Sequence, residues 1–204
     1  QPEYSVKPPK NTMRPSNRHL IYTASFTMDF ICAFMVGAVA VFAVELGARP
    51  AHLGGLGAAG AGLYVISSLI AGRLSDRFSR KWSMVAYAAI TLAASLLFTG
   101  ASRLWELYLY YAMFHVSIGM FWPTLQSLLG DSRQGSSLSA TLGNFCIFWS
   151  LGFASGHYIC GVLTEYDVTL PFTWCAVAAI GILLLCLRLK ESEALEKSAG
   201  KDFL

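Results

Sequence analysis

Six long apolar runs, of 16 to 26 residues, are the strongest constraint on how this chain of 204 residues folds. A helix needs about 20 apolar residues to span the hydrocarbon core, where no water is available to bind unpaired backbone groups. Charged residues make up only 13% of the chain and fall mostly between the runs. The pattern predicts an all-α integral membrane protein with six transmembrane helices, at about 20–44, 53–71, 82–100, 104–129, 138–163 and 172–187.

The basic residues are divided unequally between the two sides that six crossings create. Thirteen of the 15 Lys and Arg lie in the leader, the second and fourth loops, and the C-terminal end, whereas Arg49 and Arg103 lie on the other side. Loops rich in Lys and Arg stay in the cytoplasm. We therefore expect a multi-pass protein of the inner or plasma membrane. Its Pro-rich basic leader (1–19) and its tail (191–204) are both expected in the cytoplasm, on either side of a membrane domain over 20–190.

A short internal echo predicts a repeat within the six helices. The segment Gly72–Asp76 (GRLSD) ends the second run and Gly161–Glu165 (GVLTE) ends the fifth, 89 residues later. The same offset pairs Leu53-Gly54 with Leu142-Gly143. In the predicted topology the two copies end on opposite sides of the membrane, which is the pattern of a 3+3 inverted repeat.

Several classes of function are not supported by the composition. The five cysteines are widely spaced inside apolar runs, which favours small buried side chains over a metal site or cofactor. Nucleic-acid binders interleave basic and aromatic residues, and this chain does not. It also lacks the H-E-x-x-H and G-x-S-x-G motifs of common hydrolases, so we do not expect an enzyme.

Polar groups inside the runs are the candidates for function, because such groups are costly at membrane depth. Asp29 lies about two and a half turns into the first run, and we favour a solute-binding or proton-relay role over a structural hydrogen bond. His115 and His157 lie inside the fourth and fifth runs, and Asn144 in the fifth. For the histidines, solute binding or proton relay and a hydrogen bond between helices stay open as alternatives. The third and sixth runs hold no such group, so we expect them to lie away from the pathway.

The junction between the second and third runs reads Gly72-Arg-Leu-Ser-Asp-Arg-Phe-Ser-Arg-Lys81. It resembles the signature G-x-L-x-D-R-x-x-R-K of the major facilitator superfamily, with Ser79 in place of the usual glycine. In that family this junction joins the second and third helices, and its charges stabilise one state of the transport cycle. The resemblance implies such a charge network for Gly72, Asp76, Arg77, Arg80, Lys81 and Asp131.

The fifth run resembles a second motif of the same family. Gly143-x8-Gly152-x3-Gly156 matches the glycine spacing of its antiporters, but His157 and Cys160 stand where that motif has Pro and Gly. The arginine that the family carries in its fourth helix is also absent, with Tyr111 or a neighbour at that place. Coupling of the usual drug-antiporter kind is therefore not expected.

The resemblance covers one half of a twelve-helix fold, which leaves two interpretations. In the first, the chain moves a small solute by alternating access against a second six-helix half, which is another chain or another copy. In the second, it is a non-transporting scaffold subunit in a larger membrane complex, associated with pigment or lipid. We favour the first, with the lipid bilayer, the second half and the solute as partners.

Overall fold

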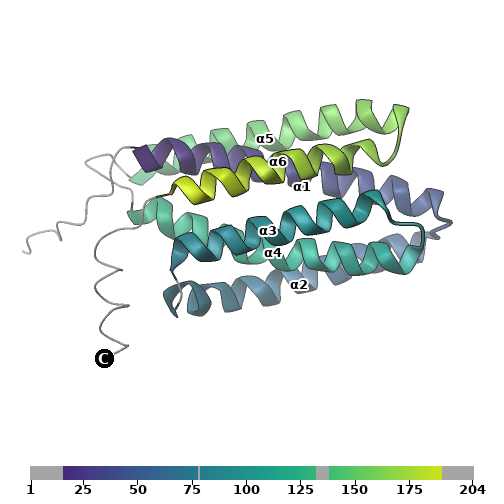
Figure 1. Cartoon of the computed structure of the whole chain (residues 1–204), viewed down its shortest axis with the longest axis horizontal. Helices are drawn as coiled ribbons and strands as arrows, with labels where there is room; N and C mark the ends of the chain where they lie inside the picture. The colour runs from purple at the N-terminus through teal and green to yellow at the C-terminus, as the bar shows by residue number, and fades with distance from the viewer. Residues whose placement is uncertain (1–15, 78, 132–137, 190–204) are drawn as a thin grey trace, which may run out of the picture.

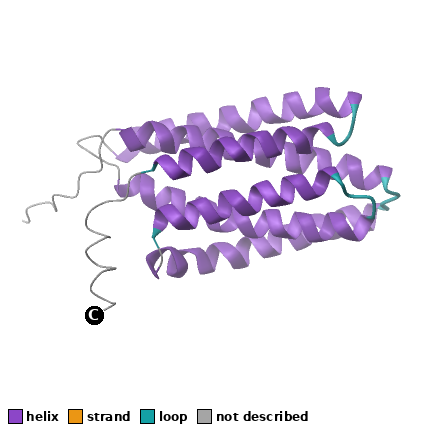
Figure 2. Ribbon diagram, viewed as in Figure 1, coloured by secondary structure: helices purple, strands orange, loops and turns teal. Residues whose placement is uncertain are grey.

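The computed structural model describes residues 16–77, 79–131 and 138–189, and all regular structure in them is α-helical (Figure 2). Six helices follow one another along the chain: α1 (Ser16–Glu45), α2 (Pro50–Arg77), α3 (Arg80–Thr99), α4 (Leu104–Asp131), α5 (Leu138–Tyr166) and α6 (Leu170–Arg188). Helix α1 begins and α6 ends at the same end of the bundle (Figure 1). The prediction of an all-α, six-helix fold is confirmed.

Five of these helices are long and apolar enough to cross a membrane, among the residues that the structure describes. The helix outside this set is α4, although it is 28 residues long. It carries the polar residues Glu106, His115 and Gln126 and an internal proline, Pro123. Helix α4 packs between α2 and α3, with His115 half-buried toward α2, Gln126 exposed and Glu106 at the end of the bundle.

The junction that was expected to be a loop is mostly helical. Helix α2 continues to Arg77 and α3 begins at Arg80, so only two residues separate them. A helix satisfies its backbone groups internally, so it continues past the apolar core into the charged segment. Ser79 then caps α3, because its hydroxyl accepts a hydrogen bond from the Trp82 N–H at 3.3 Å.

The helices form a layer of four, in the order α5, α1, α4 and α2, backed by α3 and α6. The broadest contacts are α1 with α5 and α2 with α4, whereas α6 covers α1 and α3 covers α4. Helices α3 and α6 also pack on each other, side by side at the front of Figure 1. The core lies between the layers, around stacked Phe98 and Phe172, whose ring centroids are 4.7 Å apart.

The contacts repeat with the symmetry of an inverted repeat, as the 3+3 prediction requires. Helix α1 packs on α5 and α6 as α4 packs on α2 and α3. The register agrees as well. Gly156 lies against Phe30, and a shift of 89 residues turns this pair into Ser67 and Gly119. A side chain added at Gly119 would indeed meet Ser67 and Tyr64, so the same crossing occurs in both halves, with the glycine on the other helix of the pair.

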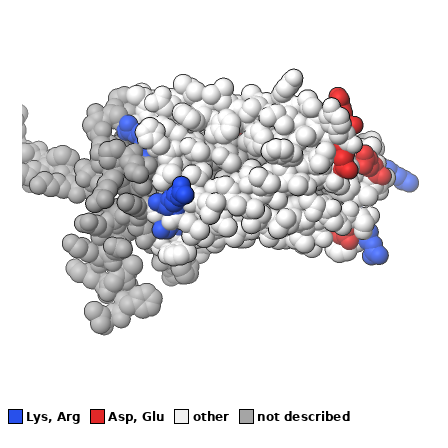
Figure 3. Space-filling model, turned by 45° about the horizontal axis from the view of Figure 1, so that its top comes forward, with Lys and Arg blue, Asp and Glu red and all other residues white. Residues whose placement is uncertain are grey.

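Charged side chains gather at the two ends of the bundle and leave its middle apolar (Figure 3). The end at which α1 begins carries Arg18, Arg80, Lys81 and Arg188 among the described side chains. The opposite end, called the acidic end below, carries the charged residues Glu45, Arg49, Arg103, Glu106, Glu165 and Asp167. This separation is typical of a protein whose apolar middle lies in a bilayer.

The cysteines follow the prediction of burial with one exception. Cys32, Cys160, Cys175 and Cys186 are buried, whereas Cys146 is exposed. Cys160 and Cys175 donate weak hydrogen bonds to carbonyl oxygens of α1, those of Phe34 and Ile31. The prediction was wrong for Cys146 because α5 buries only one side, against α1.

Candidate functional site

The side of the four-helix layer opposite α3 and α6 is uncovered, and we call it the open face. Helix α1 turns Phe42 toward α6, where it contacts the ring of Phe172 at 5.7 Å between centroids. On the other side of α1, Val36 and Val44 are 48% and 55% exposed. An apolar face of this kind, on a bundle with charged ends, needs either lipid or another protein surface to cover it.

Asp29 is buried in the middle of α1 with an unsatisfied atom. Its side chain is only 4% exposed, and its Oδ2 finds no hydrogen-bond partner among the described residues. The Cys32 thiol and the Tyr64 phenol of α2 lie within electrostatic range of its carboxyl group. A carboxyl oxygen without a partner at this depth is costly, so the position is suited to a group that receives a proton or a ligand.

His115 lies on α4 at the contact with α2. Its Nδ1 is 2.9 Å from the Tyr111 carbonyl oxygen, which can only accept, so Nδ1 carries the proton and Nε2 keeps its lone pair. Its ring lies against Gly60, where an added Cβ would be 2.8 Å from Cε1. Tyr111 packs edge-on against the imidazole at 4.1 Å between ring centroids. The glycine of α2 therefore makes room for the histidine of α4.

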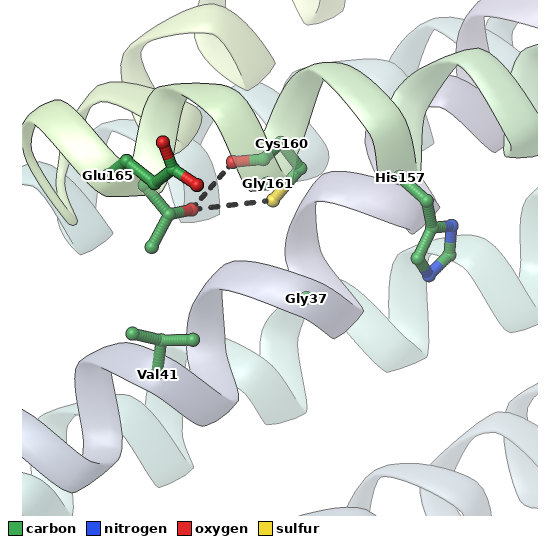
Figure 4. Close-up of a pocket in the computed structure, with 7 residues that line it drawn as sticks. Gly37, Val41, His157, Cys160, Gly161 and Glu165 are labelled. Atoms are coloured by element: carbon green, nitrogen blue, oxygen red, sulfur yellow. Dashed lines mark hydrogen bonds between the residues drawn. The ribbon is translucent and has the colours of Figure 1, made fainter.

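Two cavities flank the half of α1 nearest the acidic end. One, of about 180 Å³, lies between α1, α2 and α4 and includes Leu56, Gly57 and Tyr111 in its lining. The other, of about 340 Å³, lies between α1 and α5 (Figure 4). Its lining residues are Gly37, Val41, His157, Cys160, Gly161, Thr164 and Glu165.

Glycines explain why the second cavity lies where it does. Toward the other end of the bundle the two helices touch, since a Cβ added at Gly152 or Gly156 would collide with the Phe26 or Phe30 carbonyl of α1. At Gly161 a Cβ would meet nothing within 4 Å. The two helices still approach at Gly37, where an added Cβ would be 3.1 Å from the Cys160 thiol, and they are farther apart at Val41 and Glu165, where the cavity lies (Figure 4).

The structure places the four sequence-predicted site residues in two groups. Asp29 on α1 and His115 on α4 belong to the α1–α2–α4 side, where the imidazole packs against Tyr111 and Gly60. His157 lines the cavity between α1 and α5. Asn144 is exposed near the start of α5 and joins neither group by a described contact.

The predicted charge network falls largely outside the described side chains. Gly72, Arg80 and Lys81 are described, and Lys81 lies 5.9 Å from the centroid of the Trp82 ring. The side chains of Asp76, Arg77 and Asp131 lie outside the described part, so the network stays a prediction.

Sequence reasoning missed Thr164 and Glu165 as site residues. Glu165 was noticed only as the end of an internal echo. The signal was available, because positions 157, 161, 164 and 165 are spaced by four, three and one residues and lie on one face of a helix. The opposing residues Gly37 and Val41 carry no such signal.

Comparisons with known proteins agree with this geometry. The chain is 23% identical over 191 residues to an uncharacterized MFS-type transporter of Methanocaldococcus jannaschii, covering 91% of this chain and 48% of that protein. Crystal structures of the peptide transporter POT superpose with TM-scores of 0.71 to 0.72 at 19% identity. In the structure of POT in complex with sulfate, the superposition covers 85% of this chain and 37% of the transporter. The chain thus spans about half the length of the archaeal relative and little more than a third of POT, and the POT likeness concerns the fold.

The family model "Major Facilitator Superfamily" matches residues 20–203, which is nearly the whole chain. It includes the junction and the glycine-spaced helix on which the resemblance rested. The six helices, the inverted contacts and the open face are those of one half of that fold. The chain belongs to the Major Facilitator Superfamily.

Proposed function

We propose that this chain is one half of a transporter that moves a small solute across a membrane by alternating access. A second six-helix half, from another chain or another copy, covers the open face and encloses the solute between the halves. The proposal includes the orientation expected from the basic residues, with both ends of the chain in the cytoplasm and the acidic end outside, in an inner or plasma membrane.

The uncovered sides of α2 and α5 support a second half. In the most apolar stretch of α2, and likewise of α5, only 17% of the residues are buried, compared with 61% in α1. These two helices form the edges of the four-helix layer, where a facing half would make its first contacts. The relatives are about twice as long as this chain, which is the length needed for a second six-helix half.

The proposed transport role depends most on one observation, the buried and unpartnered carboxyl oxygen of Asp29. A buried carboxyl group with an unpartnered oxygen destabilises the resting protein, and binding of a proton or a ligand would offset that cost. In the proposal Asp29, His115, Asn144 and His157 face the solute. Gly72, Asp76, Arg77, Arg80, Lys81 and Asp131 hold one state of the cycle at the cytoplasmic end.

The test is uptake by the purified protein in liposomes, together with native mass spectrometry to identify the second half. A panel of radiolabelled amino acids, dipeptides, sugars, nucleosides and organic amines is offered with and without a proton gradient. We expect saturable uptake of one class, lowered at least about tenfold by Asp29→Asn. Ser25→Ala is the matched control, because Ser25 is also buried and unpartnered, one turn earlier on α1. Absence of binding and uptake for every solute, with any partner that copurifies, would refute the proposal.

A further inference from the structure

The cavity between α1 and α5 has a lining whose free polar groups all accept hydrogen bonds. His157 donates from Nδ1 to the Phe153 carbonyl at 3.1 Å, which leaves Nε2 as an acceptor. Thr164 donates its hydroxyl to the Cys160 carbonyl at 2.7 Å and keeps its oxygen lone pairs. The Cys160 thiol is directed to the Phe34 carbonyl at 3.6 Å. Every side-chain donor in the lining is therefore already used.

Glu165 adds a negative charge to this set of acceptors. Its side chain is exposed and makes no hydrogen bond or ion pair with another described residue. The seven lining residues include neither Lys nor Arg. A ligand that satisfies the cavity must bring both positive charge and N–H donors.

The rest of the lining is apolar and limits the size of the ligand. Val41 points from α1 into the gap (Figure 4), and Gly161 on α5 leaves space there, since an added Cβ would meet nothing within 4 Å. His157 and Glu165 lie at opposite ends of the cavity, about 12 Å apart along the axis at 1.5 Å per residue. A volume of about 340 Å³ is at the small end of ligand sites.

We propose that this cavity binds a small primary amine, in its ammonium form, that carries an apolar body. The ammonium group lies at Glu165 and Thr164, at the mouth near the acidic end, and the apolar body packs against Val41 toward His157. Asp167, an acid of the same end in the loop after α5, adds to the negative charge there and raises the local concentration of cations. As a statement of the substrate class this rests on the proposed function, whereas binding itself does not require transport.

The test is calorimetric titration of the protein in lipid nanodiscs with three probes of matched shape, corrected for empty nanodiscs. Phenethylamine carries charge and N–H donors, its N,N,N-trimethyl analogue carries only the charge, and 2-phenylethanol carries neither charge nor an N–H. We expect phenethylamine to bind at least about tenfold more tightly than either analogue, which corresponds to about 1.4 kcal/mol. Equal affinity of the trimethyl analogue, or no binding of phenethylamine, overturns the inference.

Variants then locate the binding. Glu165→Gln is expected to weaken phenethylamine binding at least about tenfold, because it removes a charge-assisted hydrogen bond. Glu45→Gln is the matched control, since Glu45 is an acid of the same end that does not line the cavity. Val41→Trp, which fills the cavity, is expected to abolish binding, whereas Val44→Trp, one turn along, is not. Unchanged affinity in Glu165→Gln and Val41→Trp refutes the site.

The binding and uptake experiments distinguish a wrong binding site from a wrong transport function. Phenethylamine binding that depends on Glu165, without uptake of any solute, retains the site and refutes the transport function. Uptake of another solute class, without phenethylamine binding, retains the transport function and refutes the site.

Discussion

The crossing of α1 and α5 makes a quantitative prediction for Gly156→Ala. The added Cβ would lie 2.7 Å from the Cβ of Ala33 and 2.8 Å from the carbonyl oxygen of Phe30. Contacts below 3.4 Å are tighter than side chains normally accept, so the helices must separate by about 0.6–0.7 Å at this point. A gap of that size forfeits a quarter to a half of the dispersion energy of the surrounding contacts.

We expect Gly156→Ala to lower the free energy of unfolding by about 1–3 kcal/mol, the usual cost of overpacking a close contact. The matched control is Gly143→Ala on the same helix, where the new Cβ meets nothing within 4 Å. That control gains helix propensity, by about 0.5–1 kcal/mol in aqueous helices, and is not expected to destabilise.

The assay is unfolding of both variants in mixed micelles with increasing dodecyl sulfate, followed by the loss of helical circular dichroism. The free energies are compared at one detergent composition, because the unfolded state in micelles is partly helical. If Gly156→Ala is as stable as Gly143→Ala, the tight crossing is not a feature of the protein, and the divergence that opens the cavity loses its explanation.

Two further predictions concern side-chain hydrogen bonds. Ser117→Ala removes the bond to Thr91 at 2.8 Å and the bond to the Tyr87 carbonyl at 2.6 Å, both of which join α4 to α3. We expect a loss of about 1 kcal/mol in the same assay, and Ser95→Ala, whose hydroxyl bonds only within α3 at Thr91, is the control that must lose less. Thr169 donates its hydroxyl and its N–H to Asp167 in the α5–α6 loop, and these bonds hold the pKa of that carboxyl below its ordinary value of 3.8. The carboxylate therefore stabilises the folded loop above that value, and this contribution is lost as the pH falls through the lowered pKa. Thr169→Val should raise the pKa of Asp167 partway back, measured by NMR titration of its carboxyl carbon, and an unchanged value would contradict the role of the hydroxyl.

Much of the architecture was determined by the sequence alone. Six apolar runs separated by charged segments require six helices, because no other structure satisfies the backbone of a single chain in lipid without closing a barrel. The offset of 89 residues between GRLSD and GVLTE predicted the inverted repeat, and the contacts of Gly156 and Gly119 reproduce that same offset. The limits of the helices were less well determined, since the charges of 72–77 mark the membrane boundary and not the end of α2.

The grouping of the polar residues was decided only by the tertiary structure. Asp29 and Tyr64 are 35 positions apart in the chain, and Val41 and Thr164 are more than 120 apart. Whether such residues meet depends on the order of the helices and on the rotation of each about its axis. That rotation is set by where glycines allow close crossings, at Gly119 between α2 and α4 and at Gly152 and Gly156 between α1 and α5.

The cavity is the clearest example of this division. The spacing of His157, Gly161 and Glu165 along α5 shows that they share a face, and it can be read from the sequence. The packing of α1 against α5 places this face opposite Gly37 and Val41, because the two helices separate beyond their tight crossing. Donor and acceptor roles also depend on local geometry, because the free nitrogen of His157 is known only once its other nitrogen is bonded to the Phe153 carbonyl. The sequence therefore determined which helices exist and which of their faces are polar, and the packing of the helices decided which of those faces meet.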